Sequence, residues 1–246
     1  MEASARLAND FFDTTCRSVM LLCLSPDYIA GKMMIVRALL SGADLLVVTP
    51  SSLPLTAIDE PIDFAAMVPA QVVESLKSTM QKSRLSRITS LIIGGAPLSP
   101  GTEVELEKLP VDMYATYGMT ETVSHVALRR IGDSLSLYCA LGGISFSIDE
   151  RNCLIIHAPH FSVKEFVTND VVELVDSRNF RWIGRYDHVI NTGGIKVFPE
   201  LIEKKIAGLF TRRFFVTSCD DLKWGESVAL VIEGEKKYFW KRFGQK

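Results

Sequence analysis

The sequence predicts an α/β fold, with a mostly parallel sheet and flanking helices, then a small antiparallel β subdomain, and then an α+β C-terminal domain. Three observations support this prediction. Compact apolar runs alternate with segments of helical length in the first half. From Ala127 the chain changes to short alternating runs between turn residues, and after Arg185 a loop leads to one helix and two strands. We therefore expect domains at residues 1–186, β-rich from about 127, and at residues 187–246.

The first elements form a βαβ unit. Val19–Leu24 and Leu45–Val48 are apolar runs typical of strands buried on both faces, and Ile29–Leu40 between them has helical length and spacing. The pattern continues with strands at Ala65–Val68, Leu91–Ile93 and Asp112–Tyr117, a helix opened by Pro69 through PAQVVESLKSTM, and a helix after Ser99 and Pro100. Such alternation predicts an open, largely parallel sheet covered by helices.

The second half predicts antiparallel structure. DERN and DSRN are the expected hairpin turns of the β-rich part. After Arg185 we expect a loop, a helix at Pro199–Ala207, and strands at Arg213–Thr217 and Ser227–Ile232, with the domain boundary near Asp187. The basic and aromatic tail from Lys236 is typical of a solvated helix packed by its aromatic side, and an interaction surface is the alternative.

The composition excludes several classes of function. A chain of 246 residues with 48% hydrophobic and 23% charged residues is an ordinary globular protein with one large core or two smaller ones. A net charge of -2 provides no field that would attract nucleic acid or anionic lipid. No apolar run reaches the length of a membrane span, so we expect no membrane insertion.

The cysteines and histidines offer no metal or disulfide framework. The five cysteines are widely spaced and form no CxxC pair, which favours a reducing compartment. The N-terminal residues do not form a signal peptide, so a cytoplasmic location follows by elimination. His157 and His160 flank Pro159 with no third ligand nearby, which argues against a metal site. A homodimer is compatible with the sequence, which leaves the oligomeric state open.

A glycine pair follows one of the predicted buried strands, in LIIGGAPLSPG. Gly94 and Gly95 let the backbone turn sharply and let a flat ligand approach main-chain atoms. Ligands in open α/β sheets bind beyond the carboxyl ends of the strands. A simple strand-to-helix turn stiffened by Pro97 and Pro100 explains this stretch equally well.

A second polar stretch, YATYGMTETVSHVAL, follows the next strand. Tyr117 and Gly118 follow the strand, and Thr120 and Glu121 come just after them. The hydroxyl can donate to a phosphate, and the carboxylate can bind a hard cation such as Mg²⁺. The alternative is a helix cap in which these two residues only begin a helix.

A third stretch, WIGRYDHVINTGGIKVFPELIE, crosses the expected domain boundary. Arg185 and Asp187 follow a strand, and Gly193 and Gly194 lead to Lys196. Arginine and lysine suit anionic ligands, and a glycine pair between them permits flexing or close approach. Each residue alone could be an exposed charge or a turn former, but the ordered combination favours a site.

These three stretches, in this order and spacing, resemble the core motifs of the adenylate-forming superfamily of acyl-CoA synthetases, peptide-synthetase adenylation domains and luciferases. The resemblance covers essentially the whole chain. It implies an enzyme that activates a carboxylate with ATP and Mg²⁺ to an acyl-adenylate and then transfers the acyl group to CoA. The partners it implies are a small-molecule carboxylate, ATP and CoA.

The resemblance also assigns roles to residues. It places Thr120, Glu121 and Lys196 in the catalytic set, with Thr120 on the AMP phosphate and Glu121 on magnesium. It assigns nucleotide binding to Gly94, Gly95, Ala96, Tyr117, Gly118, Thr120, Asp170 and Arg185, with Tyr117 stacked on adenine and the last two on the ribose. The glycine that usually precedes the ribose aspartate is Asn169 here. Asp187 corresponds to the hinge of a mobile C-terminal domain, and Gly193 and Gly194 line the CoA tunnel.

Within the superfamily the sequence looks most like the o-succinylbenzoate-CoA ligases of menaquinone biosynthesis. The segment LLCLSPDYIAGKMMIVRALLSGADLLVV is similar to the one that precedes their acyl pocket. This similarity implies an acyl pocket with Tyr28, Gly31, Lys32 and His125, although a plain core or surface role explains His125 equally well. Another acyl- or aryl-CoA ligase and a noncatalytic nucleotide- or acyl-binding module are the alternatives.

The sequence departs from the superfamily at both ends. Nothing in residues 1–17 resembles the phosphate loop that belongs upstream, and Lys246 does not lie in the motif of the distal adenylation lysine. We therefore expect both domains to be incomplete. The expectation is that a longer ligase forms the acyl-CoA, whereas these 246 residues retain at most nucleotide or acyl binding.

Overall fold

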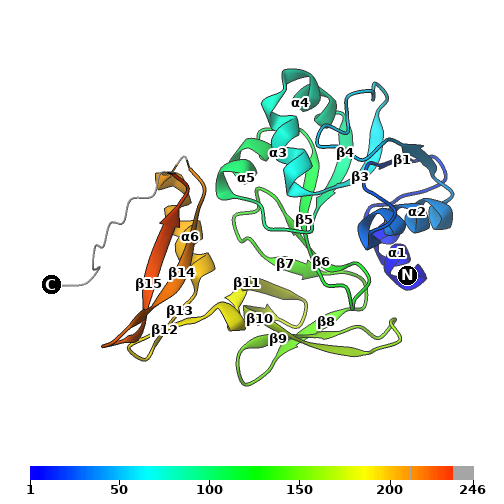
Figure 1. Cartoon of the computed structure of the whole chain (residues 1–246). Helices are drawn as coiled ribbons and strands as arrows, with labels where there is room; N and C mark the ends of the chain where they lie inside the picture. Colours follow the sequence, from blue (N-terminus) through cyan, green and yellow to red (C-terminus); the bar gives the residue numbers. More distant parts are fainter. Residues whose placement is uncertain (211, 235–246) are drawn as a thin grey trace. The chain divides into compact units, whose positions relative to one another are not determined.

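The computed structural model describes residues 1–210 and 212–234 (Figure 1). The chain forms two compact units, Met1–Tyr186 and Asp187–Lys246. The tail from Lys236, for which a helix is predicted above, lies outside the described residues. No helix among the described residues is long and apolar enough to cross a membrane.

The first unit contains an 11-stranded sheet with the order β2-β1-β3-β4-β5-β6-β7-β11-β10-β9-β8. The parallel strands are β1 (Val19–Leu22), β2 (Asp44–Val47), β3 (Ile62–Met67), β4 (Ile88–Ile93) and β5 (Asp112–Gly118). The antiparallel strands are β6 (His125–Arg130), β7 (Tyr138–Ala140), β8 (Ser145–Ile148), β9 (Cys153–His157), β10 (Glu165–Asp176) and β11 (Asn179–Arg185).

The predicted fold class is confirmed, with one difference in how its parts join. The antiparallel strands continue the parallel sheet, because β6 turns back directly alongside β5 and pairs with it from Tyr114↔Arg130 to Gly118↔His125. A short turn after β5 permits this pairing, whereas another parallel strand would need a crossover connection. The carboxyl ends of the parallel strands and the start of β6 therefore meet at one edge.

Two apolar cores lie on the two faces of the parallel strands. Met20 and Leu22 of β1 belong to one core, and Leu21 and the next residue after the strand, Cys23, belong to the other, because successive side chains of extended backbone point to opposite faces. Both faces are covered (Figure 1), which explains why these strands are continuous apolar runs. The helices of this unit are α1 (Glu2–Phe11), α2 (Ile29–Ser41), α3 (Pro69–Lys77), α4 (Thr79–Leu85) and α5 (Pro100–Leu106).

The helices differ from the expectation at two places. The single helix predicted after Pro69 is two helices, because Ser78 has extended backbone and its hydroxyl accepts from the N–H of Gln81 at the start of α4. Helix α1 occupies a segment for which the sequence suggested no element. Its Asn9 amide donates to the carbonyl of Arg37 at 2.9 Å and so joins α1 to α2.

The second unit is an α+β arrangement with a four-stranded antiparallel sheet of order β13-β12-β15-β14. Its elements are η1 (Tyr186–His188), which begins on the last residue of the first unit, and β12 (Ile190–Thr192), β13 (Ile195–Val197), α6 (Pro199–Ile206), η2 (Ala207–Leu209), β14 (Phe214–Asp221) and β15 (Gly225–Ile232). The segment after Arg185, predicted as a loop, instead contains the β12–β13 hairpin. Its turn residues Gly193 and Gly194 have φ of 57° and 84°, as the tight turns of two-residue hairpins require.

Candidate functional site

The first glycine pair lies where β4 ends, beside the ends of β3 and β5. The N–H of Gly94 donates to the carbonyl of Met67 at 3.2 Å, and a Cβ on Gly94 would lie 2.2 Å from Thr116 Oγ1. Gly95 has a φ of 87° and is exposed, as is Ala96. Glycine at 94 is therefore explained by packing against β5, while Gly95 and Ala96 present accessible backbone at the carboxyl edge of the sheet.

The polar segment after β5 is a tight turn, so the helix-cap alternative for Thr120 and Glu121 is wrong. Thr122 holds this turn: its Oγ1 accepts from the N–H of Met119 at 3.0 Å and lies 2.8 Å from the carbonyl of Ser124. Thr122 is fully buried, and this anchoring role is absent from the sequence prediction. Because Thr122 binds the turn from inside, Thr120 and Glu121 are exposed at the edge of the sheet.

Tyr117, Asp170 and Arg185, three of the predicted nucleotide-binding residues, lie together although they are far apart in the sequence. The Tyr117 hydroxyl donates to Asp170 Oδ2 at 2.6 Å, and Arg185 Nη1 lies 4.0 Å from Asp170 Oδ1. Asp170 and Arg185 are direct cross-strand partners in β10 and β11. Burial and the adjacent carboxylate both raise the pKa of Tyr117 above its ordinary value, so the phenol stays a proton donor.

Sequence reasoning missed Trp182 of β11 as a member of this group. Its Nε1–H donates to Asp170 Oδ1 at 3.1 Å, so each carboxylate oxygen of Asp170 accepts one hydrogen bond from an aromatic residue. The sequence could have indicated this role, because Trp182 is the first residue of the third motif. A carboxylate offers about four acceptor positions in all, so Asp170 retains capacity for further donors.

A bulge in β10 directs Asp170. On the β9 side the register passes from Val167↔Ile155 to Val171↔Cys153, so three residues of β10 oppose one of β9. Thr168 Oγ1 donates to the carbonyl of Leu154 at 2.8 Å and lies 3.1 Å from the N–H of Asp170. These side-chain contacts replace the ladder hydrogen bonds that the bulge interrupts.

The predicted acyl-pocket residues divide into exposed and buried positions. Tyr28 and Lys32 are exposed at the start of α2, whereas Gly31 is buried, and a Cβ there would lie 2.2 Å from the carbonyl oxygen of Ser25. Gly31 therefore permits close packing of α2 on the segment after β1. His125, at the start of β6, is buried with 7% of its surface exposed.

A buried cation beside His125 was missed by sequence reasoning. Arg37 of α2 is 2% exposed, and its Nη2 donates to Ser124 Oγ at 2.8 Å, while that hydroxyl lies 3.3 Å from His125 Nδ1. Burial lowers the pKa of Arg37 to about 10, and burial together with Arg37 lowers the pKa of His125 well below its ordinary value. The histidine is therefore neutral at pH 7.

Two nitrogens of this cluster have no hydrogen-bond partner in the described part of the chain: Arg37 Nε and His125 Nε2. A buried cation and buried donors without partners are costly, so such an arrangement favours an anionic ligand. The sequence could have indicated this buried cation, because Arg37 lies within the apolar helix segment KMMIVRALL. We call Arg37, Ser124 and His125 the Arg37 cluster.

The remaining predicted residues belong to the second unit. Asp187 lies in η1, Gly193 and Gly194 form the β12–β13 turn, and Lys196 is exposed on β13. A Cβ on Gly193 would lie 2.5 Å from the ring of Trp224, so glycine is needed there both for its positive φ and for this contact.

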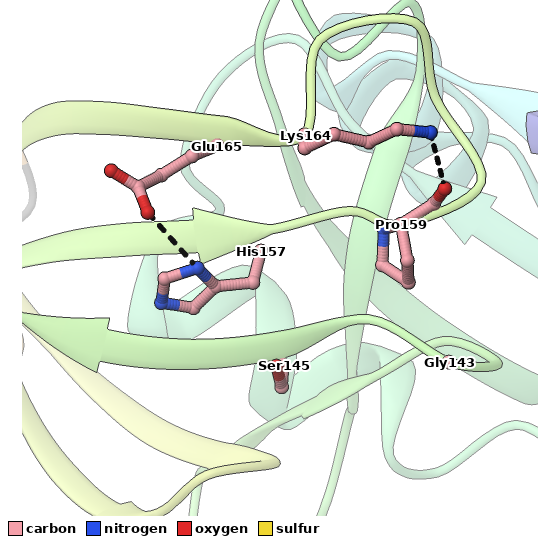
Figure 2. A pocket seen from close by; sticks show the side chains of 6 residues that line it. All are labelled: Gly143, Ser145, His157, Pro159, Lys164 and Glu165. Carbon is pink, nitrogen blue, oxygen red and sulfur yellow. Dashed lines mark hydrogen bonds and ion pairs between the residues drawn. The ribbon is translucent and has the colours of Figure 1, made fainter.

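A cavity of about 400 Å³ on the antiparallel part of the sheet contains none of the predicted site residues. Figure 2 shows His157 directed toward Glu165, with Nδ1 3.4 Å from Glu165 Oε2. Its Nε2 lies 2.7 Å from Ser147 Oγ. The described residues include no group of three His, Cys, Asp or Glu side chains placed to hold a metal ion.

Comparisons with known proteins show the family of the chain. The family model described as AMP-binding enzyme matches residues 2–144. The chain belongs to this family. A solved AMP-forming acyl-CoA synthetase/AMP-acid ligase II-like protein from Dyadobacter fermentans is 36% identical, with a TM-score of 0.72 over 96% of this chain and 69% of that one. The chain is thus related to the AMP-forming acyl-CoA synthetases.

More distant relatives are similar to this chain in sequence or in fold. A probable 2-succinylbenzoate–CoA ligase of Mycobacterium tuberculosis is 26% identical over 203 residues, which are 74% of this chain and 52% of that protein. The o-succinylbenzoate CoA synthetase of Bacillus subtilis, solved with ATP and magnesium, has a TM-score of 0.78 at 16% identity and covers 94% of this chain and 54% of that one. The chain spans about half the length of the curated relatives it matches.

Proposed function

We propose that this chain carries the adenylate site of an acid–thiol ligase, which activates o-succinylbenzoate with ATP and transfers the acyl group to CoA in menaquinone biosynthesis. The observation that carries the nucleotide part is the group formed by Tyr117, Asp170 and Arg185. Membership in the AMP-binding enzyme family supports the same reading.

The group around Asp170 has the chemistry that a ribose needs. Each oxygen of the Asp170 carboxylate already accepts one hydrogen bond, from Tyr117 or Trp182, and its remaining lone pairs can accept from two ribose hydroxyls. Arg185 adds a donor near the carboxylate, with its Nη1 4.0 Å from Asp170 Oδ1. Gly95 and Ala96 supply accessible backbone where adenine would lie, with the Tyr117 ring beside it.

The exposed turn after β5 fits the phosphate and a magnesium ion. Glu121 offers a hard carboxylate oxygen, and the Thr120 hydroxyl can donate to a phosphate oxygen. Magnesium is usually held by one or two carboxylates together with substrate phosphates, so a single protein carboxylate is sufficient. The ion would stabilise the negative charge that accumulates on the α-phosphate.

The Arg37 cluster supports an acid that carries a second carboxylate. An acyl-adenylate consumes the charge of one carboxylate, so an arginine is useful in the acyl pocket only if another anionic group remains. o-Succinylbenzoate has two carboxylates. The buried guanidinium would pair with the one that is not activated, while neutral His125 could donate to its oxygen.

In this proposal the residues of the second unit take part in the step that forms the thioester. Gly193 and Gly194 would line the path of the CoA thiol, Lys196 would contribute a cation, and Asp187 would serve as the hinge between the two half-reactions. Another acyl- or aryl-CoA ligase differs from this proposal only in the acid. A noncatalytic binding module differs in lacking turnover.

Calorimetric titration with a nonhydrolysable acyl-adenylate analogue tests the proposal. We expect the o-succinylbenzoyl analogue to bind at least about tenfold more tightly than a benzoyl analogue, because a charged hydrogen bond contributes about 1.5–3 kcal/mol. Asp170→Asn should weaken both analogues. Glu173→Gln, a matched change in a surface pair on the same strand, should weaken neither.

Each alternative has its own outcome. Equal binding of the two analogues would reject o-succinylbenzoate in favour of another acid. Pyrophosphate release from ATP, Mg²⁺ and o-succinylbenzoate would reject the noncatalytic module. Absence of binding to either analogue would reject the adenylate site itself.

A further inference from the structure

Arg151, in the turn between β8 and β9, reaches the bulge that carries Asp170. Its Nη1 donates to Asn169 Oδ1 at 3.2 Å and its Nη2 to the carbonyl of Thr168 at 3.4 Å. The guanidinium thus contacts the two residues that precede Asp170. Asn169 stands where the resemblance described above leads us to expect glycine, which would have no side chain for Arg151 to hold.

The guanidinium itself is held in place by its own turn. Arg151 Nε donates to Asp149 Oδ2 at 2.8 Å, and Asp149 Oδ1 accepts from the N–H groups of Arg151 and Cys153, both at 2.8 Å. The Asp149 side chain is 17% exposed. Because the guanidinium group is planar and its Nε is held by Asp149, its two terminal nitrogens point in a defined direction. A lysine side chain has no such fixed geometry.

The same side chain also contacts the residue that follows Arg185. The Arg151 guanidinium carbon lies 5.2 Å from the ring centroid of Tyr186, within the range of a cation–π contact. Tyr186 is the last residue of the first unit. One guanidinium therefore contacts the neighbours of both ribose-site residues, Asn169 before Asp170 and Tyr186 after Arg185.

We propose that Arg151 is a positioning residue for the ribose site. It keeps Asp170 and Arg185 at the spacing that two ribose hydroxyls need, because the bulge has lost its ladder hydrogen bonds to β9 and requires side-chain contacts to hold its shape. Arg151 itself does not touch the nucleotide. This inference rests on the proposed nucleotide site and deepens it.

The test compares AMP with 2′,3′-dideoxyadenosine monophosphate by calorimetry on the full chain. The wild type should prefer AMP by about tenfold or more, since Asp170 accepts charged hydrogen bonds from the ribose hydroxyls. Arg151→Gln should reduce this preference at least about threefold by weakening AMP alone, with the dideoxy affinity within about twofold of wild type. Asn169→Gly should produce a smaller loss of the same kind.

Arg181→Gln is the matched control, because Arg181 is a surface arginine on β11 that pairs with Glu173 away from the bulge. It should leave the preference for AMP unchanged. An unaltered preference in Arg151→Gln, or an equal loss of both nucleotides, would overturn the positioning role. Failure of the wild type to bind AMP is a separate result, which would overturn the proposed nucleotide site and this inference together.

Discussion

Replacing Arg37 by methionine should stabilise the protein and weaken its binding of a dicarboxylic acyl group. Methionine has a similar length and no charge, so it can fill the space between α2 and Ser124 without a buried cation. Buried charges that lack an ionic partner cost stability and are retained where function requires them. The substitution therefore separates a functional role from a structural one.

The magnitude follows from the burial of the guanidinium. Burial lowers the pKa of Arg37 to about 10, and a tenfold change in proton affinity corresponds to about 1.4 kcal/mol, so holding the charge costs about 3 kcal/mol. The substitution also removes the hydrogen bond to Ser124 and the contact with the Phe64 ring, and this loss lowers the stability by about 1–2 kcal/mol. The net gain should be about 1–2 kcal/mol.

Thermal and urea unfolding of the unliganded chain measure this gain. For a unit of this size we expect the Tm to rise by about 2–8 °C. Arg6→Met, at an exposed pair on α1, is the control and should change stability by less than about 0.5 kcal/mol. A Tm for Arg37→Met below that of wild type would refute the reasoning, because the arginine would then be a net stabilising part of the core.

Two further predictions concern the same edge of the sheet. The unfolded chain binds a proton at His125 more readily than the folded chain, so wild-type stability should fall by about 1 kcal/mol between pH 6.5 and 5.5. His125→Gln should remove that part of the slope in urea midpoints, and identical slopes would contradict the burial argument. Gly118→Ala should cost about 1–3 kcal/mol, because its Cβ would lie 2.5 Å from the carbonyl oxygen of Ser124. Gly101→Ala, where a Cβ has open space, should be neutral or stabilising in denaturant titrations, and equal effects would count against the steric reading.

Several local features were predictable because each depends on neighbouring residues alone. Pro69 and Pro100 begin helices, as their fixed φ and missing N–H favour. The β12–β13 hairpin was missed because strands of three residues are too short for a periodic pattern, although Gly193 and Gly194 were a turn signal. The division of the helix after Pro69 was missed because Ser78 acts as a cap only when its backbone is extended.

The candidate site likewise contains residues that the sequence could identify and residues whose roles only the folded chain reveals. Asp170 and Arg185 could be named from motifs, whereas the roles of Trp182 and Arg37 depend on partners distant in the sequence. Thr122 binds Met119 and Ser124, which are near it in the sequence, but only if the segment after β5 forms a turn. Arg37 meets Ser124 across 87 positions, and a helix pattern alone does not distinguish a buried arginine from an exposed one.

The sequence by itself determined the fold class, the alternation of strands and helices in the parallel part and the family, because apolar periodicity and motif spacing are properties of the chain. Tertiary structure alone decided that the antiparallel strands continue the parallel sheet, and that a bulge directs Asp170 toward Tyr117. Strand pairing and burial depend on which distant segments meet, so they arise only when the whole chain packs.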